Sequence, residues 1–338
     1  MAERPPALET VTLRSLARRA AVPLIVVLVV AGIASALLSQ TARLDDFAWR
    51  FTPGWLVLAA VAFLAYQAML CGVWMLLMRD LGCSRPLRRQ AAIWNVSLLP
   101  RYTPTSALMT VVRVGMYERE GVARRTTLVA SVYELLLQLI VAVVVGAWWM
   151  LHMDQLEDHW SRYLLLAVPL LGFVSLHPRI LGKGVAILLR RFGREGEPVT
   201  LPTRQVLVAA LLYAVCFLTA GVGVLGVALA LHPVDAGDVP LVIASFAIGF
   251  VVSVLAFMLP GGLGARETGL ATALTPALPF AVGLAVAVAT RAAQMAIEVL
   301  YAAVSQMLGG RVRTDAERPE AGPEPQPAPP TQTAEPVR

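Results

Sequence analysis

Charged residues interrupt apolar sequence at several points in this chain, and one of these points also carries a group of glycines. The stretch LPGGLGARETGL, residues 259–270, follows a long apolar run and places a proline and three glycines before Arg266. A helix broken at such residues leaves backbone N–H groups unpaired, and the positive end of the next helix dipole attracts an anion. Gly261, Gly262 and Gly264 would let this backbone approach a bound group closely. We therefore predict an anion site here, of a kind suited to phosphate.

A second set of polar residues lies on one face of the last apolar segment. Arg291, Gln294 and Glu298 are spaced i, i+3 and i+7, which places them on a common helix face. An ionised group at the centre of a bilayer costs about 2.5–3.5 kcal/mol, so these residues are expected to face the protein interior or a wet cavity. The predicted anion-binding residues are Gly261, Gly262, Gly264, Arg266, Arg291, Arg101 and Arg113. The predicted charge-balancing or gating residues are Glu134, Glu267, Gln294 and Glu298. The alternative is that these charges only form intramembrane pairs that fix helix packing.

Catalytic motifs and resident cofactors are not predicted. The sequence GGLGARET lacks the Gly-Lys-Ser/Thr ending of a Walker A loop, so ATP hydrolysis is not implied. Neither a nucleophile elbow nor a carboxylate pair at diagnostic spacing occurs. The three cysteines and four histidines are scattered without CxxC or HExxH spacing, so no metal site is expected. Glu267 could act as a base, but nothing beside it resembles an oriented nucleophile.

The composition assigns the chain to a membrane. Of its 338 residues, 57% are hydrophobic and only 15% are charged, whereas a soluble domain carries roughly a quarter charged residues. We predict an all-α integral membrane protein, because several runs reach the length of about 20 apolar residues needed to cross a bilayer. The predicted spanning segments are 20–39, 55–78, 128–150, 163–177, 205–232 and 279–308. Arginines that flank these segments explain the net charge of +6, so nucleic-acid binding is not expected.

Two further apolar stretches, 91–116 and 240–276, are interrupted in the middle by proline and glycine. Basic segments, 78–90 and 117–125, flank both ends of the first stretch, and basic segments are expected in the cytoplasm. A stretch that enters and leaves on one side is a re-entrant hairpin, which a membrane accepts where the broken backbone is buried in protein or lines a cavity. We predict one such hairpin from the cytoplasm and a second one from the outside.

The predicted architecture is therefore about six spanning helices plus two re-entrant hairpins. Half one, 20–150, and half two, 163–308, each contain two helices, a hairpin and a closing helix, which indicates an inverted repeat. Inverted repeats with discontinuous helices are typical of secondary transporters. The membrane domain is expected to cover 20–310, between a cytoplasmic N-terminal segment, 1–19, and a disordered cytoplasmic tail, 311–338, rich in Pro, Glu and Ala.

Two of these stretches resemble a known family. LPGGLGARETGL resembles the PGGLGxRE segment of the lysylphosphatidylglycerol synthase transmembrane-region proteins, also called flippase-like proteins. The stretch PRYTPTSALMTVVRVGMYEREGVARRTTLVASVYELLL, residues 100–137, is similar to their other hallmark, where an interrupted segment leads to an Arg, a basic loop and a helix with a Glu. Arg291 in the last helix also fits. The resemblance covers roughly residues 20–310.

The resemblance implies movement of a phospholipid or another amphipathic lipid between leaflets, with the predicted anion site holding the lipid headgroup. Two departures qualify this implication. Pro104, Thr105 and Ser106 stand where many members have a PGxxG-like sequence. Members that make aminoacylated lipids also carry a large soluble C-terminal acyltransferase-like domain, whereas this chain ends in the predicted disordered tail, so lipid aminoacylation is not expected.

The expected function is that of a flippase-like protein, not an enzyme, which translocates or binds an anionic phospholipid or a polyprenyl-phosphate-linked lipid. We expect a multi-pass protein of the cell inner (cytoplasmic) membrane with both termini in the cytoplasm. One alternative is a non-transporting membrane partner that presents lipid to a separately encoded, membrane-associated transferase. Another is an intramembrane transferase with Glu267 as its base.

Overall fold

The structure of the chain is a computed structural model. It describes residues 52–102, 107–151, 167–168, 170–172, 174–191, 201–256 and 264–309. Within these ranges the secondary structure is helical and contains no β-strand, which confirms the all-α prediction. Several predicted features lie outside the described residues: the helix 20–39, part of 163–177, the terminal segments 1–19 and 311–338, and the glycines Gly261 and Gly262.

Five of the described helices are long and apolar enough to cross a membrane. They are α3 (Pro53–Asp80), α6 (Arg124–Leu151), α9 (Thr203–Leu231), α10 (Val239–Ala256) and α12 (Phe280–Gly309). Helices α3, α6, α9 and α12 overlap the predicted segments 55–78, 128–150, 205–232 and 279–308. Helix α10 forms the first part of the second interrupted stretch, where the sequence predicts one limb of a hairpin.

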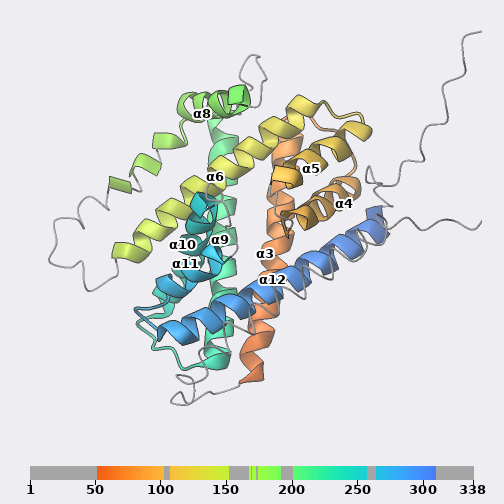
Figure 1. The fold of residues 1–338 in the computed structure, drawn as a ribbon. Coiled ribbons are helices and arrows are strands. Elements are labelled where there is room, and N and C mark those ends of the chain that lie inside the picture. Colours follow the sequence, from red (N-terminus) through yellow and green to blue (C-terminus); the bar gives the residue numbers. More distant parts are fainter. Residues whose placement is uncertain are drawn as a thin grey trace, which may run out of the picture.

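Helices α3 and α9 lie side by side in the centre of the molecule and run in opposite directions (Figure 1). The amide of Thr52, at the start of α3, donates a 3.0 Å hydrogen bond to the carbonyl of Ala230, at the end of α9. Glycine permits this close contact, because a Cβ at Gly226 would lie 2.9 Å from the Trp55 carbonyl oxygen. Small residues at such contacts are typical of helix packing in membranes.

The first interrupted stretch folds into two short antiparallel helices, α4 (Leu87–Leu98) and α5 (Ala107–Arg119), with a 3₁₀ turn at Leu99–Tyr102. Near one end of this pair, Nη2 of Arg89 forms a salt bridge with Oε1 of Glu120 at 2.6 Å. Further along the pair, Nε of Arg113, in the middle of α5, donates a 2.9 Å hydrogen bond to the hydroxyl of Ser97, near the end of α4. With 12 and 13 residues, each helix is about 18–20 Å long, which is short of the roughly 30 Å hydrocarbon core.

The second interrupted stretch consists of α10 and the nine-residue helix α11 (Ala265–Ala273). A Cβ at Gly249 would lie 3.1 Å from that of Leu270, and a Cβ at Gly269 would lie 2.7 Å from that of Val252, so the two helices are antiparallel and closely packed. Helix α12 then runs back along α11. Nine residues span only about 13 Å, so α11 by itself is too short to cross a bilayer.

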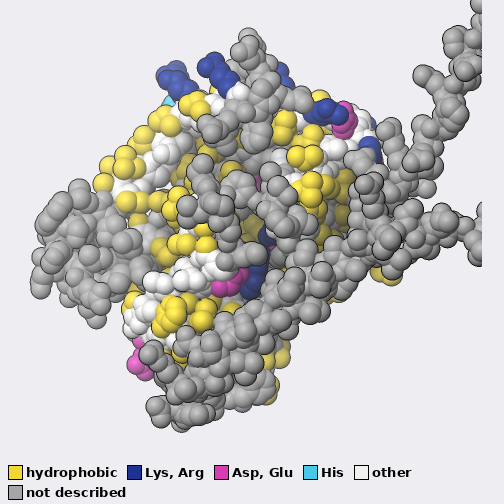
Figure 2. Space-filling model, in the orientation of Figure 1, with side chains coloured by type: hydrophobic (Ala, Val, Ile, Leu, Met, Phe, Trp, Pro, Cys, Tyr) yellow, Lys and Arg dark blue, Asp and Glu magenta, His cyan; other side chains and the backbone are white. Residues whose placement is uncertain are grey.

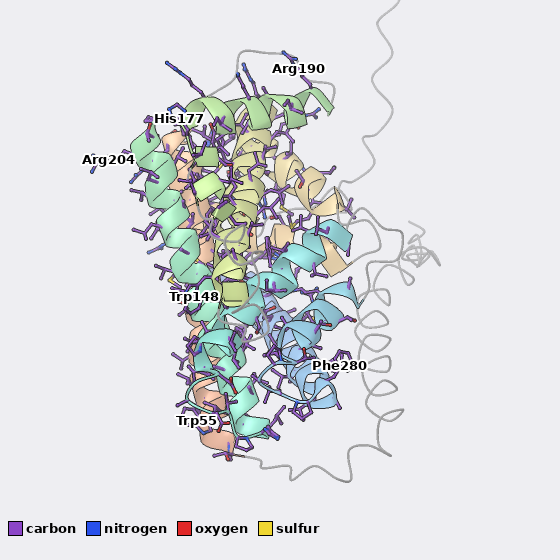
Figure 3. The ribbon with its side chains drawn as sticks, turned by 90° about the vertical axis from the view of Figure 1, so that its left-hand side faces the viewer. Trp55, Trp148, His177, Arg190, Arg204 and Phe280 are labelled. Atoms are coloured by element: carbon purple, nitrogen blue, oxygen red, sulfur yellow. The ribbon has the colours of Figure 1, made fainter. Side chains whose placement is uncertain are left out.

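One helix was not expected from the sequence. Residues 183–197 read as a basic segment between spanning helices, but the structure has an amphipathic helix, α8, over Pro178–Arg191. Leu181 and Val185 on one side of α8 are buried, and Gly184 packs against Leu136 of α6. Figure 3 shows α8 lying across the end of the bundle where Arg204 begins α9, opposite the end marked by Trp55.

Basic side chains gather at this same end of the molecule. Figure 2 shows Lys and Arg along one edge of the space-filling surface, above the apolar sides. The end of α12 lies here too, because Nη1 of Arg89 donates a 3.3 Å hydrogen bond to the carbonyl of Gly309. The ends of α3 and α12 and the starts of α6 and α9 therefore share one basic end, as the charge pattern of the sequence predicts.

Candidate functional site

A small cleft, partly open to solvent, lies between α10, α11 and α12. Figure 1 shows these three helices adjoining one another in the C-terminal half of the chain. The lining residues are Phe246 and Gly249 of α10, Arg266, Glu267 and Leu270 of α11, and Ala287, Thr290, Arg291 and Gln294 of α12. Four of the predicted site residues, Arg266, Glu267, Arg291 and Gln294, therefore meet in one place.

Gly264 begins the helix that carries two of these residues. It has a φ of 94°, in the left-handed region, and forms the N-cap of α11. Glycine adopts this conformation without the steric cost that a Cβ imposes. The turn places Arg266 and Glu267 in the first turn of α11, where unpaired backbone N–H groups and the positive end of the helix dipole favour an anion. Of the three glycines predicted to bind an anion, Gly264 is the one within the described residues.

Arg266 is held by an aromatic ring. Its guanidinium carbon lies 5.2 Å from the centroid of the Phe246 ring, within the range of a cation–π interaction. Its neighbour Glu267 instead faces Arg291, with Oε1 3.6 Å from Nε. Among the residues that the structure describes, no carboxylate forms a salt bridge with Arg266. This arginine is therefore a positive charge without a matching negative one.

The first interrupted stretch also sends an arginine to this region. Nη1 of Arg101 lies 3.1 Å from Oε1 of Glu298 on α12, which links the two halves of the chain. Arg101 and Arg291 both lie near enough to Arg266 for their charges to repel its own. Within the described part of the chain, this cluster holds three arginines, Arg101, Arg266 and Arg291, against two carboxylates, Glu267 and Glu298. One positive charge remains in excess.

Two neutral groups in the cleft have no hydrogen-bond partner. The hydroxyl of Thr290 and the amide nitrogen of Gln294 are buried, and both residues are less than 7% exposed. A buried donor without a partner costs about 1–3 kcal/mol, so both groups would gain from a bound acceptor. Thr290 is not among the site residues predicted from the sequence. Its place four residues before Gln294, on the same helix face, is the signal that could have found it.

Arg113 and Glu134 do not line the cleft, although the sequence analysis grouped them with the site. The Nη1 atom of Arg113 donates to Oε2 of Glu134, and its guanidinium carbon lies 4.3 Å from the centroid of the Trp74 ring. Trp94 donates a 3.3 Å hydrogen bond to the other oxygen of Glu134. Arg113 is 1% exposed. This pair therefore joins α5 to α6 and α3 as an internal contact, which matches the helix-packing alternative for these two residues.

Comparison with known protein families is consistent with this membrane architecture. The family described as the lysylphosphatidylglycerol synthase TM region matches residues 10–302, which include every residue that lines the cleft and both interrupted stretches. None of the curated proteins matches the chain. A family match over most of the chain confirms the resemblance seen in the two stretches, and the chain belongs to the lysylphosphatidylglycerol synthase TM-region family, which ties this multi-pass membrane protein to lipid metabolism.

Proposed function

We propose that the chain binds the phosphate of an anionic lipid in the cleft between α10, α11 and α12 and moves that lipid between the leaflets of the bacterial cytoplasmic membrane. The observation that carries the proposal is the excess positive charge at Arg266, beside two buried donors that lack partners. A single lipid phosphodiester carries one negative charge and several acceptor oxygens. It would neutralise the cluster and satisfy Thr290 and Gln294 together.

The chemistry of each group fits this role. A guanidinium presents parallel N–H donors that match two phosphate oxygens, and such charge-assisted bonds are stronger than neutral ones. Arg291 lines the same cleft, and the 3.6 Å separation between its Nε and Oε1 of Glu267 is longer than a direct hydrogen bond. Glu267 offsets one of the two arginine charges that line the empty cleft.

The short helices support transport rather than binding alone. Helices α4, α5 and α11, with nine to thirteen residues each, end inside a bilayer if they begin at its surface, which is how discontinuous helices place binding sites at depth in transporters. Arg101 comes from one such region and Arg266 from the other. The cluster would therefore lie between a hairpin from each side, where small movements of either one open the site to a different leaflet.

A liposome assay tests the proposal. Purified protein is reconstituted with fluorescent phosphatidylglycerol or a polyprenyl phosphate, and the loss of inner-leaflet label to a membrane-impermeant reductant is followed. Arg266→Ala should slow transfer about 10- to 100-fold, the loss expected when a charged group gives up its hydrogen bonds. Arg204→Ala, which removes an exposed arginine at the start of α9, should leave the rate unchanged.

The outcomes separate transport from the alternatives. If lipid is bound but not transferred, and a transferase co-purifies with the protein, the chain presents lipid to a partner and the transport part of the proposal fails. If purified protein converts a lipid-linked donor into product, and Glu267→Gln abolishes conversion, the chain is an intramembrane transferase. Equal transfer rates for Arg266→Ala and the unsubstituted protein would remove the cleft from the mechanism.

A further inference from the structure

Helix α8 presents three different faces. Leu181 and Val185 are buried against the bundle, at 3% and 0% exposure. Arg179, Lys183 and Arg190 are exposed, and the helical repeat of about 100° per residue places all three within about 40° of one another, on the side away from the buried face. Two isoleucines lie beside the cations on a third face. These exposed isoleucines are Ile180 and Ile187, at 46% and 65% exposure.

The cations of α8 differ from other arginines at the same end of the molecule. Arg79, Arg89 and Arg124 form salt bridges with Asp80, Glu120 and Glu118. The sequence of α8, PRILGKGVAILLRR, contains four basic residues and no acidic one. Arg179, Lys183 and Arg190 form no salt bridge with any described carboxylate. The α8 cations are therefore available to an external anionic partner.

Two apolar faces and one cationic face define the surroundings that the helix requires. The buried face contacts α6, so the isoleucine face needs a second apolar environment and the cationic face needs negative charge. Figure 3 shows α8 lying across the basic end of the bundle, with Arg190 directed away from it. At 14 residues, α8 is about 21 Å long, too short to cross the bilayer, and its length lies along the surface instead. The headgroup region of a membrane satisfies both needs at once.

We propose that α8 is a binding surface for anionic lipid headgroups, with Ile180 and Ile187 inserted among acyl chains and Arg179, Lys183 and Arg190 on the phosphates. No α8 residue lines the cleft, so this surface is separate from the proposed transport site. Each Lys or Arg close to an anionic bilayer surface raises the equilibrium constant for binding to that surface about fivefold. Three aligned cations would therefore enrich anionic lipid along α8 well beyond its bulk fraction.

A single fluorophore on α8 tests the proposal in the full-length protein. All three native cysteines are buried, so a cysteine introduced by Ile187→Cys can be labelled selectively. The labelled protein is placed in nanodiscs of equal phosphatidylglycerol and phosphatidylcholine, with bromine atoms near the headgroup end of the acyl chains of one lipid at a time. Quenching should be at least about fivefold steeper when the bromine is on phosphatidylglycerol. Lys183→Gln together with Arg190→Gln should remove this preference.

Matched controls make each outcome decisive. Arg85→Gln together with Arg88→Gln removes the same charge from exposed residues at the same end of the molecule, but outside α8, and should preserve the preference. Lys183→Arg should also preserve it, which shows that charge at this position is what matters. Equal quenching by both lipids, loss of the preference in the Arg85/Arg88 variant, or a label quenched by aqueous iodide and not by either lipid would each overturn the proposal.

Discussion

Two arginines of this protein, the buried Arg113 and the partly buried Arg266, have opposite surroundings. Arg113 has a carboxylate, a serine hydroxyl and a tryptophan face around its guanidinium, whereas Arg266 has the ring of Phe246 and the repulsion of two other arginines. A buried ion pair that loses one partner leaves an uncompensated charge, which is strongly destabilising. Replacing an arginine that has no carboxylate partner leaves no unpaired charge behind. The two residues are therefore expected to respond differently to substitution.

Arg113→Ala should destabilise the protein by about 3–5 kcal/mol, because Glu134 would be left charged and buried. Thermal unfolding in detergent measures the effect as a lowered midpoint. The double variant Arg113→Met with Glu134→Leu should recover most of the loss, since it removes both charges and retains side-chain volume. A double variant as unstable as the single one would show that the ion pair is not what Arg113 contributes.

Gln294→Leu should lower lipid binding without lowering stability, because the Gln294 amide nitrogen has no partner in the empty cleft. The matched control is Gln67→Leu. Gln67 is also buried, but its amide nitrogen donates a 3.2 Å hydrogen bond to Asn95. Gln67→Leu leaves the Asn95 oxygen unpaired and should cost about 1–3 kcal/mol. Unfolding midpoints and retained lipid are measured for both variants, and equal stability losses in the two would contradict an unpartnered Gln294.

Sequence could locate the buried charges but not their partners. The i, i+3, i+7 spacing of Arg291, Gln294 and Glu298 predicts a shared helix face, because that periodicity is local. The contacts of Arg113 with Glu134 and of Arg101 with Glu298 depend on how distant helices pack, which local spacing does not encode. For this reason, the site predicted from the sequence included four arginines, Arg101, Arg113, Arg266 and Arg291, whereas the structure separates Arg113 from the cleft.

At the scale of elements, the fold depends on glycines where helices touch. A Cβ at Gly221 of α9 would collide with the backbone carbonyl of Ile243 in α10, whereas a Cβ at Gly72 of α3 would meet no atom within 4 Å. Gly221→Ala should therefore push α10 away from α9 and lower the unfolding midpoint. Gly72→Ala should be neutral or stabilising by up to about 1 kcal/mol, because alanine is the better helix former. Equal midpoints for the two variants would contradict this packing.

The interrupted stretches were predictable as elements, whereas α8 was not. Proline and glycine within an apolar run indicate a broken helix wherever they occur, so 91–116 and 240–276 could be recognised without knowing what they contact. The segment that forms α8 carries four basic residues and lies beside spanning segments, where charge alone indicates a loop. Its helix is stabilised by burial of Leu181 and Val185, a tertiary effect.

At the scale of the whole molecule, the described parts of the two halves contain matching elements. Helix α3, the α4–α5 pair and α6 correspond in order to α9, the α10–α11 pair and α12. An ion pair joins the returning helix to the closing helix in each half, with the charges exchanged: Arg113 with Glu134 in the first, and Glu267 with Arg291 in the second. The inverted repeat stays a prediction, and this correspondence supports it.

The distribution of charge predicts which end of the bundle faces the cytoplasm. Basic residues gather at the end of the bundle that includes the α5–α6 connection, and the acidic α9–α10 connection lies at the other end, so the first should be cytoplasmic. Ala123→Cys and Ala236→Cys place exposed thiols at these two ends, and the native cysteines are buried. A membrane-impermeant thiol reagent added to intact cells should label Ala236→Cys and spare Ala123→Cys. The reverse labelling pattern would invert the assigned topology.

The central claim is that Arg266 holds the phosphate of a lipid in the cleft. Native mass spectrometry of the purified protein tests it most directly, by measuring how much anionic phospholipid remains bound. The unsubstituted protein and Arg204→Gln should retain the lipid to the same extent, and Arg266→Gln should retain about tenfold less or lower. Equal retention of the lipid by Arg266→Gln and Arg204→Gln would contradict the account.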